Sequence, residues 1–237
     1  MKNQSNFRKR GLFKRLLRTF FKIILYAFLS SLLYIFLCKW INPPITITQL
    51  NSLVSGKGLH RDYINYNEMG ANIKLAVLAG EDQLFPDHNG FDFKSIQKAM
   101  KHNQKSKSLR GASTISQQVA KNVFLWQHGG YFRKGLEVYF TFMIEHIWDK
   151  KRILEMYLNV AEMGKGVFGI EAAANYYFKK SAEKLTRREA AMIASCLPNP
   201  LLFTIKPMSA RISYRYPWIM RQMNNLQADP DIQALLK

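Results

Sequence analysis

A polar segment near the middle of the chain, residues 111–124, brings hydroxyl, amide and ammonium groups together. Thr114 and Gln117 have the spacing of a capping box, which predicts that a helix begins there. A helix N-terminus with hydroxyls before it and a cation after it, here Lys121, can hold an anion such as phosphate. An ordinary capped amphipathic helix has the same pattern, so this segment alone does not decide between the two.

A second cluster, earlier in the chain, consists of two adjacent acids, Glu81 and Asp82. They follow the apolar stretch 73–79, which predicts a helix, and precede a turn rich in Pro, Asn and Gly. Two acids at a helix C-terminus oppose the helix dipole, and such local conflicts with stability are typical of functional sites. The alternative is a pair of solvated acids at a frayed helix end.

Together with three later runs, these clusters resemble, in order, the five motifs of the family 51 glycosyltransferases, the peptidoglycan transglycosylases. The first two motifs match through Glu81, Asp82, Phe85, His88 and Gly90, and through residues 111–122. The others match through residues 133–137, 150–159, and 185–191 with 197–200. The resemblance covers residues 66–225, and its one mild departure is Ala112, which is Gly in many relatives.

The resemblance implies an enzyme that polymerises glycan strands from a lipid-linked disaccharide diphosphate, lipid II, and releases polyprenyl diphosphate. Such a transfer needs a base for the attacking hydroxyl and positive charge for the leaving diphosphate. We expect Glu81 to be the base and, by the resemblance, Glu137 to be the second catalytic carboxylate. The expected substrate-binding residues are Asp82, Ser113, Thr114, Gln117, Gln118, Lys121, Asn122, Arg133 and Lys134, of which Lys121, Arg133 and Lys134 would hold the diphosphate.

Metal and cofactor expectations also centre on Glu137. By the resemblance it would hold a divalent cation, Mg or Mn, through the substrate diphosphate, and no organic cofactor is expected. Alternatively, Glu137 forms an ion pair with Arg133 or Lys134 on one helix face.

The five histidines lack metal-ligand spacing, which argues against a zinc site. Residues 164–169 fit G-x-G-x-x-G, but no strand precedes them, so we interpret them as a glycine turn rather than a dinucleotide site.

Residues 20–41 form a nearly continuous apolar stretch, with no charge between Ile23 and Cys38. As a helix this stretch would be about 33 Å long, enough for a hydrocarbon core of ~30 Å. Basic residues gather before it, so the positive-inside rule predicts a cytoplasmic N-terminus and an external domain. The alternative, a cleaved signal peptide, is disfavoured by the length of the stretch and by the lack of a small-x-small site before Asn42.

The predicted organisation is a basic cytoplasmic tail (1–19), a transmembrane helix (20–41), a juxtamembrane connector (42–65) and a family 51 domain (66–237). Helical periodicity dominates after residue 66, which predicts a mostly α domain; the resemblance implies a lysozyme-like fold. Residues 45–48 are expected to be extended, 101–110 to form a loop, and Tyr216–Leu226 to form the terminal helix. Cys38 and Cys196 are expected to stay unpaired. Too few residues follow Asn199 for a transpeptidase domain, so none is expected.

The net charge of +19 favours an anionic partner: nucleic acid, acidic lipid or a diphosphate. Two other function classes remain. One is a lysozyme-like glycan hydrolase, which does not need the cations around Glu137. The other is a non-enzymatic membrane-anchored binder, which leaves the Glu81-Asp82 motif unexplained.

By the resemblance the partners are lipid II, the nascent glycan strand, membrane lipids and other cell-wall synthesis or division proteins, without nucleic acid. The expected location is a bacterial inner membrane with a periplasmic catalytic domain. Candidates for membrane contact are Trp126, Tyr131, Phe132, Phe140 and Phe142.

Overall fold

The structure, a computed structural model, describes residues 2–106, 111–127 and 129–237, with side chains from Phe13 onward. The chain divides into two compact units, one ending at Ile41 and one spanning Asn42–Lys237, each described here by itself. The first unit contains helix α1 (Lys2–Cys38). Its segment Phe13–Cys38 has a mean hydropathy of 2.1 and is long and apolar enough to cross a membrane, although a signal sequence would have the same properties.

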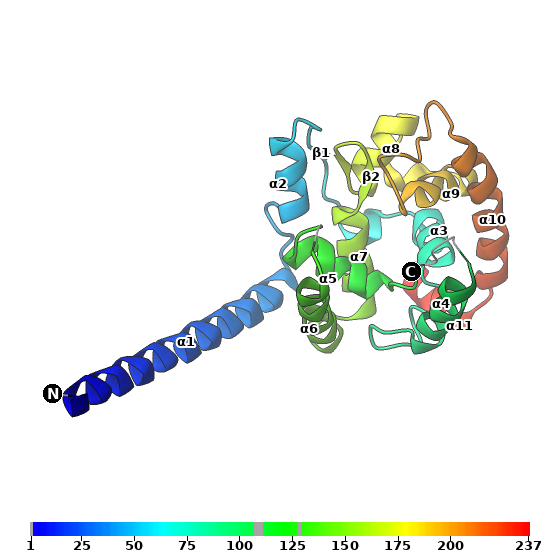
Figure 1. The fold of residues 1–237 in the computed structure, drawn as a ribbon. Coiled ribbons are helices and arrows are strands. Elements are labelled where there is room, and N and C mark those ends of the chain that lie inside the picture. The colour runs from blue at the N-terminus through cyan, green and yellow to red at the C-terminus, as the bar shows by residue number, and fades with distance from the viewer. Residues whose placement is uncertain (1, 107–110, 128) are drawn as a thin grey trace. The chain divides into compact units, whose positions relative to one another are not determined.

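The second unit is mostly helical, as predicted (Figure 1). Its α-helices are α2 (Ile47–Val54), α3 (Ala71–Glu81), α4 (Phe93–Lys105), α5 (Ile115–Phe124), α6 (Tyr131–Ile147), α7 (Lys150–Val160), α8 (Ile170–Phe178), α9 (Arg187–Cys196), α10 (Ala210–Leu226) and α11 (Pro230–Leu236). A small sheet, β1 (His60–Arg61), β2 (Glu162–Gly164) and β3 (Val167–Phe168), has the order β1-β3-β2. Strand β3 pairs in parallel with β1 and antiparallel with β2.

Helix α3 is deeply buried, because every residue from Ile73 to Ala79 is inaccessible or nearly so. It packs against α9 and α10, while α5 packs against α6 and α7 (Figure 1). Each apolar side chain that is fully buried in this way contributes about 1.5–3 kcal/mol to folding. Glu81, the last residue of α3, therefore lies at the end of a rigid element.

The predicted capping box at the start of α5 is confirmed. The Gln117 N–H donates to Thr114 Oγ1 at 3.2 Å, and the Thr114 N–H donates to Gln117 Oε1 at 3.0 Å. Thr114 Oγ1 also donates to the Gly90 carbonyl at 2.7 Å. Gly90 has φ +87°, and a Cβ there would lie 2.7 Å from Thr141 Cγ2 on α6. A glycine is thus required where the turn after α3 meets α5 and α6.

Three local expectations are wrong or incomplete. Residues 47–48, expected to be extended, begin α2, because Thr46 and Gln49 form another capping box. Residues 101–105, expected in a loop, are the end of α4, and residues 107–110 lie outside the described residues. The sequence periodicity placed the start of the last long helix at Tyr216, whereas α10 begins at Ala210 and includes Pro217.

Candidate active site

The Glu81 carboxylate is held by two donors from other helices. Gln118 Nε2 of α5 donates to Glu81 Oε2 at 3.0 Å, and Arg215 Nη2 of α10 donates to Oε1 at 3.3 Å. The Glu81 side chain is 11% exposed. Burial raises its pKa, and the Gln118 hydrogen bond and the Arg215 charge partly oppose that shift. A carboxylate with a raised pKa and fixed orientation is suited to accepting a proton.

Tyr157 of α7 determines how the Gln118 amide faces Glu81. Its hydroxyl donates to Gln118 Oε1 at 3.2 Å, so the amide nitrogen is left to donate to Glu81. Tyr157 is completely buried, and burial raises the pKa of its hydroxyl well above the usual value. The hydroxyl therefore stays protonated, and α7 positions Glu81 through α5.

Asp82 connects α3 to α5 in this structure, and its expected contact with substrate stays a prediction. Its carboxylate accepts a hydrogen bond from the Ile115 N–H at 2.9 Å and lies 3.0 Å from His88 Nε2. His88 Nδ1 accepts the Gly90 N–H at 3.1 Å, so Nε2 is the protonated nitrogen that faces Asp82. Asp82 thus supports Glu81 indirectly, because it holds the helix that carries Gln118.

Lys121 is a half-buried cation on α5, and its ammonium makes no hydrogen bond or ion pair within the part of the chain that the structure describes. Burial lowers its pKa most, and the charges of Arg133 and Lys134 lower it further. Glu137 and Glu81 both act in the opposite direction. Lys121 therefore lies within electrostatic reach of both predicted catalytic carboxylates.

Glu137 is buried on α6 between two cations of its own helix. Arg133 Nη1 lies 2.7 Å from Glu137 Oε2, and Lys134 Nζ contacts Oε1. The structure therefore contains the helical ion pairs that were the alternative interpretation of Glu137. The Nε of Arg133 is buried and has no partner among the described residues, and the Lys134 side chain is 45% exposed. Both cations retain donors that can reach an added anion.

We call Glu81, Lys121, Arg133, Lys134 and Glu137 the carboxylate–cation cluster. It combines a buried carboxylate (Glu81), a cation with no ion pair among the described residues (Lys121) and two cations that share the Glu137 carboxylate. The first can accept a proton, and the cations can hold a polyanionic leaving group. The cluster therefore contains the two groups that a glycosyl transfer from a diphosphate requires.

Four other predicted substrate ligands lie apart from this cluster or already have partners. The side chains of Thr114 and Gln117 form the capping box. Asn122 Oδ1 accepts from Gln127 Nε2 at 3.1 Å, and the same nitrogen donates to Thr48 Oγ1 of α2 at 2.8 Å. Ser113 is exposed just before α5. Contacts of these residues with substrate stay a prediction.

A second network connects three of the sequence motifs at the turn that follows Glu81. Ser116 Oγ of α5 donates to Glu145 Oε1 of α6, and Lys150 Nζ lies 2.9 Å from Glu145 Oε2. Lys150 also donates to the His88 carbonyl at 2.6 Å and lies 4.6 Å from the Phe85 ring centroid. These contacts fix the turn after Glu81 against α5, α6 and the start of α7. Lys150 and Tyr157 were recognisable as members of the fourth motif, whereas Arg215 lies outside all five motifs.

Protein ligands for a divalent cation do not gather at Glu137. Within residues 2–106, 111–127 and 129–237, no three His, Cys, Asp or Glu side chains are arranged to hold a metal ion. Both Glu137 oxygens already face cations. The donor set of the protein alone therefore does not fit the Mg or Mn expected there, because such ions require several oxygen ligands.

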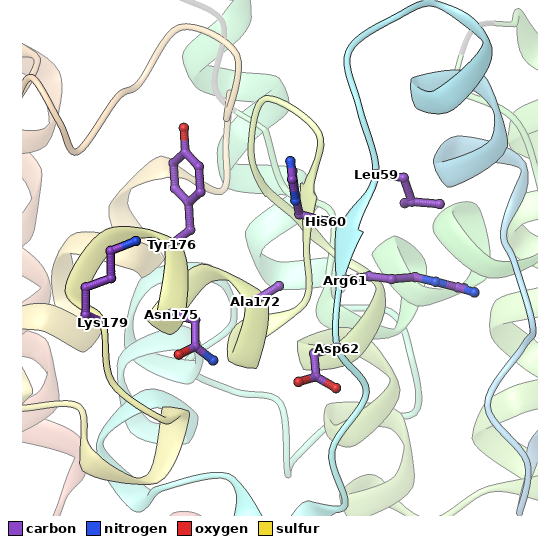
Figure 2. A pocket seen from close by; sticks show the side chains of 8 residues that line it. All are labelled: Leu59, His60, Arg61, Asp62, Ala172, Asn175, Tyr176 and Lys179. Atoms are coloured by element: carbon purple, nitrogen blue, oxygen red, sulfur yellow. The ribbon is translucent and has the colours of Figure 1, made fainter.

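An open cleft of about 430 Å³ lies elsewhere, between β1 and α8 (Figure 2). Its lining includes His60, Asp62, Asn175, Tyr176 and Lys179, and none of the predicted site residues. Figure 2 shows Arg61 turned away from α8. These side chains do not converge on one point. We therefore regard the carboxylate–cation cluster, and not this cleft, as the candidate catalytic site.

Comparisons with known proteins identify the family of this chain. Residues 47–224 match the family described as Transglycosylase. A biosynthetic peptidoglycan transglycosylase of Mannheimia succiniciproducens is 53% identical over 165 residues, which cover 70% of this chain and 68% of that protein. A protein of the same name from Shigella boydii is 53% identical over 175 residues, which cover 73% of this chain and 72% of that protein. Another from Aeromonas hydrophila is 46% identical over 194 residues, which cover 80% of this chain and 83% of that protein. The chain belongs to the transglycosylase family.

Proposed function

We propose that the carboxylate–cation cluster polymerises glycan strands from lipid II and releases polyprenyl diphosphate. The family and the named relatives make the chain a peptidoglycan glycosyltransferase of cell-wall synthesis. The observation that carries the assignment to this cluster is Lys121, a half-buried cation that forms no ion pair with any residue the structure describes and lies within electrostatic reach of both Glu81 and Glu137. A diphosphate would supply the missing negative charge.

In this mechanism Glu81 accepts the proton of a sugar hydroxyl on one substrate molecule. The hydroxyl oxygen then forms a bond to the anomeric carbon of the other molecule. The bond from that carbon to the diphosphate oxygen breaks, and the diphosphate leaves with the electron pair. Lys121, Arg133 and Lys134 stabilise the negative charge that develops on it. These three side chains supply the positive charge, because the described protein donors at Glu137 do not form a site for a metal ion.

One experiment distinguishes the proposed polymerase from a lysozyme-like hydrolase and from a non-enzymatic binder. Purified full-length protein is mixed with lipid II in one reaction and with finished glycan in another. We expect polymer from lipid II and no change in the finished glycan. Shortened glycan would indicate a hydrolase, and binding without reaction would indicate a binder. Either result would contradict the proposal.

We also propose that α2 and the start of α6 contact the membrane that holds the substrate. Helix α2 is amphipathic in the reverse of the usual sense: Thr48, Gln49 and Ser52 are buried. Its exposed side chains are Ile47, Leu50, Leu53 and Val54. Tyr131 and Phe132 at the start of α6 are 98% and 75% exposed, and both helices pack against α5. A lipid surface suits such an apolar patch, because its exposure to water is unfavourable.

Two of the aromatic candidates for this contact differ in their surroundings. Phe142 is half exposed on α6, as a lipid contact requires. Phe140 instead stacks on Phe124 of α5, with ring centroids 4.7 Å apart, so it supports the packing of α6 on α5. The proposed lipid-facing surface therefore includes Phe142 but not Phe140.

For the location, we propose a single-pass anchor in a bacterial inner membrane, with the N-terminus in the cytoplasm and the Asn42–Lys237 unit in the periplasm. The support is the apolar segment of α1 and the basic residues that precede Ile23. The sequence also has no Asp or Glu before Asp62, so the N-terminal flank is purely basic. A cysteine placed at Asn3 should be inaccessible to a membrane-impermeant thiol reagent in intact spheroplasts, while one at Lys57 should react.

A further inference from the structure

Arg215 of α10 contacts both the backbone and the side chain at the end of α3. Its Nη2 donates to the Gly80 carbonyl at 2.9 Å and to Glu81 Oε1 at 3.3 Å. The last carbonyls of a helix lack partners within the helix, and a cation near them is favourable. One guanidinium therefore holds the peptide group next to Glu81 and one oxygen of its carboxylate.

The close approach of α10 to this point depends on Gly80. A Cβ at Gly80 would lie 3.1 Å from Ile219 Cδ1, one turn beyond Arg215 on α10. The absence of a side chain thus lets the two helices pack tightly enough for Arg215 to reach the Gly80 carbonyl. Further along α10, Gln222 Oε1 accepts from Gln83 Nε2 at 3.4 Å, which holds the other side of the same turn.

Arg215 is the cation that contacts Glu81 directly among the residues the structure describes. From α5, Gln118 donates a neutral hydrogen bond, and Lys121 acts through space. Asp82, next in the chain, adds a negative charge. Two buried groups from α7 and α9 complete the surroundings: the Tyr157 hydroxyl, and the Cys196 thiol, whose pKa burial raises to about 12. Both are neutral near pH 7, so they do not compensate the Glu81 charge.

We propose that Arg215 is a positioning residue for Glu81, which orients the carboxylate and keeps it ionised so that it can accept the proton of the attacking hydroxyl. The inference rests on the proposed role of Glu81 as the base. Arg215 Nε is buried without a partner among the described residues, so the guanidinium is held by its Nη2 contacts and by packing. It lies 5.8 Å from the Trp218 ring centroid on the same helix.

The test measures the protonation of Glu81 independently of activity. Full-length protein labelled with ¹³C at the glutamate carboxyl carbon is titrated in detergent micelles by NMR, and Glu81→Gln identifies the Glu81 signal. In Arg215→Gln we expect the Glu81 carboxyl to titrate about one pH unit higher than in the wild type. In Arg215→Lys we expect a smaller upward shift, because the ammonium keeps the positive charge but lies on a more flexible stem that is less well oriented than the guanidinium. Arg221→Gln, an exposed position on the same helix, is the control without a shift.

The pH profile of kcat/KM with lipid II, which reports groups of the free enzyme, supplies the second readout. Because Glu81 must be ionised to act as a base, the acidic limb in Arg215→Gln should move to higher pH by the same amount as the NMR titration. A folded Arg215→Gln protein with an unchanged Glu81 titration would overturn the inference. If that variant does not fold, Arg215→Lys decides, and an unchanged titration there overturns it. If instead Glu81→Gln polymerises normally, the proposed base is wrong, whatever the titration shows.

Discussion

At the scale of single residues, Glu81 has the surroundings of a base rather than of a structural ion pair. It is nearly buried, has a raised pKa, and accepts one neutral and one charged hydrogen bond. Glu137 has the opposite surroundings, because two cations of its own helix hold it. The two carboxylates are therefore chemically distinct, and this difference supports one proton acceptor and one organiser of cations.

Glu81→Gln should keep the fold and lower polymerisation about a hundredfold or more, because the amide has nearly the same shape but accepts no proton. Circular dichroism and lipid II consumption measure the two effects. Glu183→Gln, an exposed change on another part of the surface, is the matched control and should behave as the wild type. Near-normal turnover by a folded Glu81→Gln protein would show that another group is the base.

Lys121→Ala should weaken binding of the lipid diphosphate about tenfold or more, because a charge-assisted hydrogen bond is worth about 1.5–3 kcal/mol. Binding of a neutral glycan should change little. Lys98→Ala, an exposed lysine within α4, controls for loss of charge on a helix. Equal weakening for both ligands would mean that Lys121 acts through packing or stability instead.

At the scale of elements, features encoded by neighbouring residues could be predicted and those encoded across the fold could not. Thr114 and Gln117 specify the start of α5 within four residues, and the structure confirms it. Helix α2 was not predicted, because residues 45–48 alternate between Ile and Thr as a strand does, although Thr46 and Gln49 also have the spacing of a capping box. The strands of two or three residues are too short to show a period of two.

The candidate site follows the same division. Glu81, Lys121 and Glu137 could be predicted, because each belongs to a motif with fixed spacing. Arg215 could not, because its contact with Glu81 depends on how closely α10 packs against Gly80. The spacing of neighbouring residues does not show that Arg215 and Glu81, which are far apart in the chain, lie in contact in the fold.

Helix α11 is joined to α3 by a buried lysine, and this contact makes a prediction about pH. Lys74 is 2% exposed, lies 3.7 Å from the Tyr66 ring centroid and 3.5 Å from the Leu236 carbonyl, and has its pKa lowered by burial to about 8. Between pH 8 and 10 the unfolded chain binds more protons at this lysine than the folded chain. The free energy of unfolding should therefore rise with pH.

Lys74→Met should remove this rise, so that the difference in unfolding free energy between variant and wild type changes by on the order of 1 kcal/mol from pH 7.5 to 9.5. Urea unfolding at several pH values measures it. The difference between the two proteins is the relevant quantity, because the Cys196 thiol, with its pKa near 12, acts in the opposite direction above pH 9 in both. Parallel curves for the two proteins would show that Lys74 does not cause the pH dependence.

At the scale of the whole molecule, the proposed catalytic cluster and the proposed membrane anchor belong to different parts of the chain. The apolar segment Phe13–Cys38 lies in the unit that ends at Ile41. The carboxylate–cation cluster and the family match at 47–224 lie in the other unit. The anchor is expected to confine the enzyme to the surface that holds its lipid substrate, which raises the effective concentration of both.

Removal of residues 1–41 should therefore leave a folded protein that polymerises lipid II in detergent but works poorly at low enzyme concentration on substrate in liposomes. The remaining chain keeps an excess of basic residues and the exposed apolar face of α2, so some affinity for acidic liposomes should persist. Because salt screens the charge contribution, the loss of activity on liposomes should grow with ionic strength. Activity in detergent and sedimentation with liposomes separate chemistry from attachment. A truncated protein that is folded yet inactive in detergent would place part of the substrate site in the first 41 residues.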